Sequence, residues 1–151
     1  MFADYHVHTA FSDDSIYPME QVVQDAISKK IDEICFTEHV DYGIKVDWDS
    51  GKEIVYRNGE PCANCNYPLY MKTIKQMKKR YGNKITIKTG LEFGMQMHTI
   101  KLYEKLFSQY DLDFVLLSIH QVNDLEFWNQ DYQGGKTQKE YNEGYYDEML
   151  Q

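Results

Sequence analysis

Four of the five histidines in this sequence stand at the ends of short apolar runs. His6 and His8 close the run at the N-terminus, His39 follows the second run, and His120 follows the fourth. Because His6 and His8 are two residues apart on an extended backbone, both imidazoles point to the same side and can chelate one cation. Imidazole together with carboxylate suits Zn, Mn, Fe or Ni, so this spacing indicates metal chemistry.

Carboxylates stand at the same kind of position. Glu92 follows the third apolar run, and Glu38 directly precedes His39. Taken singly, a His-x-His pair is often a packing or surface feature, and a glutamate after a strand is often only a charge at a helix N-terminus. The repetition at every strand end favours metal binding. A bridging Glu92 would hold two ions ~3.5–4 Å apart, which suits hydroxide attack on a phosphorus or carbonyl centre.

Short apolar runs alternate with amphipathic stretches along the whole chain. We predict strands over residues 2–8, 34–37, 85–91 and 114–119, and helices over residues 18–30, 66–81, 99–110 and from 137 into Gln151. Pro18 suits the first turn of its helix, and Asn66 can cap the second helix with Pro68 inside the first turn. Thr137 and Glu140 form a capping box that opens the last helix.

The βαβαβαβα order predicts an α/β fold with parallel strands and right-handed crossovers. In such a sheet the carboxyl ends of the strands lie along one edge, where active sites are built, so the strand-end residues should converge there. Four units are too few to close an eightfold barrel. The sequence therefore predicts either half of a barrel or an open sheet.

Residues 40–66 read as a long irregular loop, with a turn at Asn58-Gly59. Three aspartates of this loop are most simply solvated (Asp41, Asp47 and Asp49). Cys62-x-x-Cys65 is half a zinc knuckle, but without a second pair it is more simply two free thiols. His98 fits a surface or cap position. We expect Trp48 and Trp128, which lie in loops beside the strand ends, to be pocket residues or plain surface residues. Asp4 either orients a metal-binding imidazole or is a strand-entry charge.

Composition limits the class of protein. The chain has 151 residues, which predicts one domain, and its formal net charge of −8 disfavours a nucleic-acid partner. No apolar run approaches the length of a membrane helix, and no signal-peptide pattern opens the chain, so we expect no membrane partner. Three cysteines that cannot all pair fit a reduced, cytoplasmic setting. Self-association into a homo-oligomer stays open.

Four motifs in this order resemble the PHP (polymerase and histidinol phosphatase) family, and most of all its histidinol-phosphatase branch. They are DYHVHT at residues 4–9, FTEH at 36–39, GLE at 90–92 and SIH at 118–120. The likeness runs over essentially the whole chain. It implies the N-terminal part of a distorted (β/α)7 TIM-like barrel that carries two or three divalent metal ions (Zn, Mn or Fe).

Matched position by position, the resemblance implies a role for each strand-end residue. His6 and His8 match the first metal pair, Glu92 the bridging carboxylate, and His120 the next metal ligand. His39 matches the ligand after the second strand, and Asp14 matches a third-metal ligand for which Asp13 competes. Glu92, His120 and His39 are then the expected catalytic residues.

The implied reaction is hydrolysis of L-histidinol phosphate, a small phosphorylated substrate, to L-histidinol and phosphate in histidine biosynthesis. Family members continue into later strands that carry a further His, an Asp-x-His pair and a substrate-binding Arg, none of which is in this sequence. The expected organisation is therefore one PHP domain over residues 1–151, truncated at its C-terminus. The alternatives are another PHP-type phosphodiesterase or exonuclease acting on nucleotides, and a non-catalytic metal-binding module.

Overall fold

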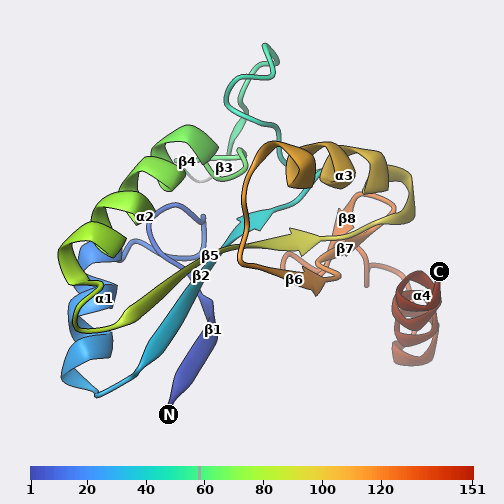
Figure 1. The fold of residues 1–151 in the computed structure, drawn as a ribbon. Helices are drawn as coiled ribbons and strands as arrows, with labels where there is room; N and C mark the ends of the chain where they lie inside the picture. The colour runs from blue at the N-terminus through green and yellow to red at the C-terminus, as the bar shows by residue number, and fades with distance from the viewer. Residues whose placement is uncertain (58) are drawn as a thin grey trace.

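A computed structural model describes residues 1–57 and 59–151 (Figure 1). A four-stranded parallel sheet in the order β1-β2-β5-β6 forms its centre. These strands are β1 (Ala3–Val7), β2 (Glu33–Val40), β5 (Thr86–Gly94) and β6 (Phe114–Ser118). The helices are α1 (Met19–Ser28), α2 (Tyr67–Tyr81), α3 (Ile100–Gln109) and α4 (Gln138–Leu150), with a 3₁₀ turn η1 (Met97–Thr99) before α3. Two small antiparallel pairs complete the fold: β3 (Tyr56–Arg57) with β4 (Glu60–Pro61), and β7 (Gln121–Val122) with β8 (Leu125–Glu126).

The sheet is curled, so the molecule is half of a barrel and not an open sheet. Tyr5 on β1 and Phe114 on β6 lie on the two outermost strands, yet their ring centroids are 5.1 Å apart. A flat sheet would keep these strands about three strand spacings apart, at ~4.7–4.9 Å each. The carboxyl ends of the strands are consequently drawn together on one side of the half-barrel.

The core lies between this sheet and the helices α1, α2 and α3, which connect its successive strands. Figure 1 shows α1, α2 and α3 along the sheet and α4 apart from it. Val23 of α1, Tyr70 of α2 and Leu106 of α3 are buried in one hydrophobic cluster with Phe36 of β2 and Leu91 of β5. Apolar side chains at helical spacing supply this face, as the sequence predicts. No side chain of α4 is buried.

The predicted helix starts are confirmed to within one residue, although Pro18 lies just before α1 and not in its first turn. Asn66 caps α2 by accepting a hydrogen bond from the backbone of Leu69, and Pro68 lies within the first turn. Thr137 and Glu140 form the reciprocal capping box of α4. All four predicted strands exist, but β2 and β5 are longer than their apolar runs. Glu38 and His39 therefore lie inside β2, where the register pairs His39 with Glu92 of β5.

The loop after β2 is more ordered than predicted, because it contains the β3–β4 pair. The predicted turn at Asn58-Gly59 includes residue 58, which lies outside the described residues. The prediction that Asp47 is solvated is wrong. Its carboxylate accepts hydrogen bonds from the hydroxyls of Tyr42 and Tyr67, at 2.9 and 2.8 Å, and from the side-chain amide of Asn64 at 2.8 Å. Asp49 is exposed, as expected. Each helix in the described part of the chain is too short or too polar to cross a bilayer.

Candidate metal centre

Glu92 lies at the centre of a cluster of imidazoles at the carboxyl ends of the strands. Its Oε2 is 2.9 Å from His6 Nε2 and 2.9 Å from His8 Nε2, while its Oε1 is 3.0 Å from His120 Nε2. The glutamate side chain is only 3% exposed. A single buried carboxylate therefore faces histidines from the first strand on one side and from the end of the fourth on the other.

Asp14 extends the cluster from the loop that follows β1. Its Oδ2 is 2.9 Å from His8 Nδ1 and 3.5 Å from His39 Nε2. The neighbouring Asp13 instead contacts the ammonium group of Lys45 at 2.7 Å. The structure thus distinguishes two adjacent acids that the sequence left in competition. It also brings together all six residues considered as metal ligands, which are His6, His8, Asp14, His39, Glu92 and His120.

Asp41 belongs to the same cluster, so its assignment to a solvated loop is wrong. The residue is 4% exposed, its Oδ1 is 2.7 Å from His120 Nδ1, and its Oδ2 is 3.4 Å from His39 Nδ1. Its backbone N–H donates to Asn64 Oδ1 at 2.9 Å, which holds the chain at this turn. A signal was present in the sequence, because Asp41 directly follows β2 and so stands at a strand end like the histidines.

Ser118 is a second residue that the sequence analysis missed. The last residue of β6, it donates a hydrogen bond to Glu92 Oε1 at 2.6 Å. The hydroxyl therefore helps to orient the central carboxylate. Glu38, in contrast, faces away from the cluster. It is fully buried and accepts hydrogen bonds from Thr9 and Ser12, which ties the loop after β1 to β2.

The donor atoms form three overlapping groups that could each hold a cation. The groups are His6 with His8 and Glu92, His8 with Asp14 and His39, and His39 with Asp41 and His120, and within each group the atoms lie within 4.8 Å of one another. One atom gives a direct test of fit. His8 Nε2 is buried 2.9 Å from Glu92 Oε2 without the alignment of a hydrogen bond, and the described residues offer it no other partner. A cation between these atoms would satisfy both, so the residues fit a metal.

The cluster alters the acidity of its members. Burial opposes protonation of His8, but its hydrogen bond with Asp14 and the negative charges of Asp14 and Glu92 outweigh it and raise the pKa of His8 to about 10. His120 is also opposed by burial, yet Asp41 and Glu92 raise its pKa to about 9. Burial of Glu92 and Asp41 favours their neutral forms, but the neighbouring imidazoles outweigh it and hold the pKa of both carboxyl groups below the usual range. Such strong coupling is typical of functional sites.

These shifts predict that the metal-free protein is most stable in mildly acidic solution. The pKa values of His8 and His120, about 10 and about 9, lie above the ordinary 6.5, so protonation stabilises the fold fully below pH 6.5. That contribution is lost as the pH rises through 9 to 10. The lowered pKa values of Asp14, Asp41 and Glu92 act in the opposite sense, and their contribution is lost as the pH falls below about 4.

We therefore expect the thermal midpoint of the chelator-treated protein to be highest between about pH 5 and 6.5 and to fall by several degrees at about pH 9.5. Circular dichroism melting curves in EDTA across this range would measure it. A midpoint that stays level or rises from pH 6.5 to 9.5 would contradict the assigned contacts.

Gly94 leaves the space in which Asp41 and His120 meet. It ends β5, and a Cβ there would overlap Asp41 Oδ1 and lie 2.9 Å from His120 Nδ1. We expect Gly94→Ala to displace the carboxylate and to weaken divalent-metal binding about tenfold, as loss of a partner behind a metal-binding histidine does. Calorimetric titration with Mn²⁺ would measure the change. Gly134→Ala is the matched control, because its Cβ would have no neighbour closer than 3.4 Å. Equal affinities for the two variants would refute this role.

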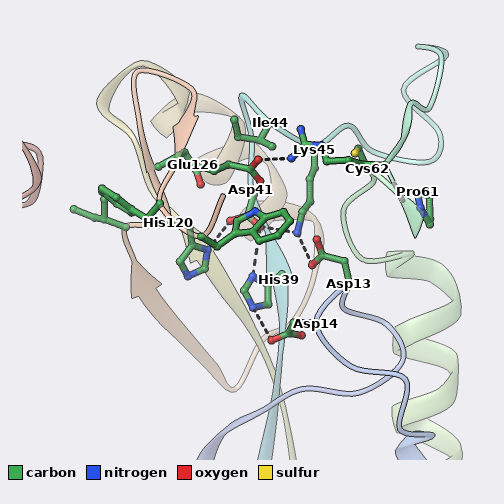
Figure 2. A pocket seen from close by; sticks show the side chains of 15 residues that line it. Asp13, Asp14, His39, Asp41, Ile44, Lys45, Pro61, Cys62, His120 and Glu126 are labelled. Atoms are coloured by element: carbon green, nitrogen blue, oxygen red, sulfur yellow. Dashed lines mark hydrogen bonds and ion pairs between the residues drawn. The ribbon is translucent and has the colours of Figure 1, made fainter. Parts of the chain in front are cut away.

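A cavity of about 550 Å³ opens beside the cluster (Figure 2). It is lined by four residues of the cluster, Asp14, His39, Asp41 and His120, and by residues of the two small strand pairs and the loop after β8, namely Arg57, Glu126, Phe127 and Trp128. Within this lining, Arg57 of β3 and Glu126 of β8 form an ion pair. Trp128 thus contributes to the pocket, whereas Trp48 does not line it.

The remaining candidates lie outside the cluster. His98 is on the surface beside Asp124, at 3.0 Å, as expected. Asp4 is exposed and accepts from the backbone of His6, not from its ring. Cys62 and Cys65 are free thiols, and no metal-binding group among the described residues includes a cysteine. Cys65 is buried, while Cys62 lines the cavity.

A parallel sheet curled into half a barrel, with a candidate metal centre at the carboxyl ends of its strands, places this molecule among the TIM-like α/β barrels. The PHP domain model matches residues 4–151, and the chain belongs to that family. Histidinol-phosphatase of Lactococcus lactis subsp. lactis (strain IL1403) is 31% identical over 126 residues, which cover 83% of this chain and 42% of that protein. A probable histidinol-phosphatase of Clostridium acetobutylicum is 31% identical over 150 residues, covering 99% and 51%.

One solved structure is similar over nearly the whole chain. It is the crystal structure of the histidinol phosphate phosphatase from Lactococcus lactis complexed with Zn, L-histidinol and phosphate. The TM-score is 0.83 at 30% sequence identity, and the match covers 99% of this chain and 52% of that one. The chain spans about half the length of the curated relatives it matches.

Proposed function

We propose that this protein is a metal-dependent phosphomonoesterase and that its substrate is L-histidinol phosphate. The observation that carries the proposal is the cluster around Glu92, which lies at the carboxyl ends of four strands in a PHP domain. The solved relative that holds Zn, L-histidinol and phosphate supports both the cofactor and the substrate. Within the proposal, two or three divalent ions (Zn, Mn or Fe) are held by His6, His8, Asp14, His39, Glu92 and His120.

Bound divalent cations would supply an acidified water at neutral pH and would neutralise the phosphate dianion. The residues of this chain prepare that environment. Glu92 presents one carboxylate oxygen to His6 and His8 and the other to His120, which is the arrangement expected of a bridging ligand. Asp41 contacts Nδ1 of His120 and so directs the opposite nitrogen, Nε2, toward Glu92.

The cavity gives the proposed substrate its place. His39 and His120 line it together with Asp14 and Asp41, so a phosphate group that enters would meet the metal-binding side chains directly. We assign Glu92, His39 and His120 as the catalytic residues, acting on the phosphate through the cations that they hold. The aromatic part of the lining, Phe127 and Trp128, would then surround the alcohol part of the substrate.

Phosphate release from L-histidinol phosphate by the Mn²⁺- or Zn²⁺-loaded chain tests the proposal, with a dinucleotide as the competing substrate. We expect turnover of the monoester and far slower cleavage of the dinucleotide. Faster cleavage of the dinucleotide would replace the proposed activity with a nucleotide phosphodiesterase. Stoichiometric metal binding with no turnover of either compound would identify a non-catalytic metal-binding module.

A further inference from the structure

Lys45 is a buried cation in the wall of the cavity. Its side chain is 6% exposed, and Nζ lies 2.7 Å from Asp13 Oδ1 and 2.8 Å from Asp41 Oδ2. The turn after β2 holds it there, because the backbone N–H of Lys45 donates to the carbonyl of Asp41 at 2.8 Å. Figure 2 shows its side chain reaching from this turn toward both carboxylates.

The two carboxylates keep this lysine charged. Burial alone would lower the pKa of Lys45, but Asp41 and Asp13 outweigh it and the pKa is raised. An ammonium group is rarely buried unless it is paired, and here the pairing is with one acid of the metal cluster and one acid outside it. The charge of Lys45 is therefore a permanent feature of the cavity at neutral pH.

The ammonium group has one more donor than these contacts use. A lysine carries three N–H donors. Two are taken by Asp13 and Asp41, and the part of the chain that the structure describes supplies no third acceptor. Since Lys45 lines the same cavity as His39 and His120, the remaining donor is available to a molecule bound there.

Most of the other charged groups that line the cavity are acidic. Asp13, Asp14, Asp41 and Glu126 give the lining a strongly acidic character that would repel a phosphate dianion in the absence of cations. Arg57, the other lysine or arginine among the described lining residues, forms an ion pair with Glu126. Lys45 thus lies next to Asp41 of the cluster, with one N–H donor left for a molecule bound in the cavity.

We propose that Lys45 donates a hydrogen bond to a phosphate oxygen of the bound ligand, on the side of the cavity that carries the metal cluster. This inference rests on the proposed function in that it takes the ligand to be a phosphate monoester. It adds a substrate-contacting residue that holds no metal. A charge-assisted hydrogen bond of this kind corresponds to a loss of about tenfold or more in phosphate affinity when the donor is removed.

Binding of inorganic phosphate to the Mn²⁺-loaded full chain, measured by isothermal titration calorimetry, tests the inference without relying on turnover. We expect Lys45→Met to weaken phosphate binding about tenfold or more, and Lys45→Arg to restore most of it because the charge and donors remain. Lys139→Met is the matched control. It removes the same charge from an 82%-exposed side chain on α4 and should leave phosphate affinity unchanged.

Asp13→Asn gives a prediction of opposite sign. Asp13 is partly exposed at 38% and contacts Lys45, so the variant removes one competing carboxylate and should tighten phosphate binding several-fold. This variant decides the matter if circular dichroism shows that Lys45→Met fails to fold. A purely structural lysine would lower stability in Lys45→Met without altering phosphate affinity in either variant, and that result would overturn the inference. So would the absence of phosphate binding by the parent chain.

The two proposals can fail separately. Phosphate binding that depends on Lys45, in a chain that releases no phosphate from L-histidinol phosphate, would contradict the proposed substrate and retain the lysine contact. Turnover of L-histidinol phosphate with phosphate affinity insensitive to Lys45→Met would retain the enzyme and reject the contact.

Discussion

Glu92→Gln is expected to lower both divalent-metal affinity and phosphate release by more than about 100-fold. The carboxylate is 3% exposed and meets three imidazole nitrogens within 3.0 Å, so no other group can replace its charge. Loss of a residue that only hydrogen-bonds to a metal-binding histidine lowers metal affinity or activity about 10–100-fold. Loss of the central carboxylate should lower both by more than that. Metal content by mass spectrometry after dialysis and phosphate release from L-histidinol phosphate would measure the two effects.

Glu104→Gln provides the control for that variant, because Glu104 is exposed on α3 and the change in charge is identical. It should bind metal and release phosphate as the parent chain does. If Glu92→Gln kept full metal content and rate, Glu92 would have no part in the centre, and the proposed function would lose its main support.

Asp41→Asn should be the second most damaging change, with effects on both metal binding and stability. An uncharged amide of the same size would weaken the contacts to His120 and His39, which predicts a 10–100-fold loss of metal affinity. It would also leave the buried Lys45 with one carboxylate in place of two. Removing one member of a buried ion pair costs about 3–5 kcal/mol when the other charge is left unpaired. Because Asp13 still pairs with Lys45, we expect a smaller loss in the free energy of unfolding.

Urea denaturation of the metal-free protein, followed by Mn²⁺ titration of the folded variant, separates these two effects. Asp49→Asn is the control, since Asp49 lies in the same loop but is exposed. If Asp41→Asn had the same free energy of unfolding and the same Mn²⁺ affinity as Asp49→Asn, Asp41 would have no role in the cluster.

The fold could be predicted largely because helices and strands differ in the spacing of their apolar residues. Asn66 with Pro68, and Thr137 with Glu140, marked helix starts through their chemistry alone. Strand β2 was predicted too short because the predicted strand stopped before the first charged residue, Glu38. Pairing with β5 nevertheless continues through Glu38 and His39 to Val40.

The site was predicted less completely, for reasons of distance and orientation. Position at a strand end was enough to predict that His6, His8, His39, Glu92 and His120 lie together, since parallel strands end at one edge. Choosing between Asp13 and Asp14 depends on which way two adjacent side chains point, and spacing carries no such information. Asp41 was judged by the acidic composition of its loop, when its place directly after β2 was the better criterion.

The ring contact between Tyr5 and Phe114 has a consequence for folding as well as for shape. Cations held by His6 and by His120, each next to one oxygen of Glu92, would link the first and the last strand of the sheet. Such a link restricts the unfolded chain most when it joins segments distant in sequence, so part of the binding energy of the ions becomes conformational stability. Chelation should then loosen the outermost strands first, and the middle pair, β2 with β5, should keep its amide protons longest.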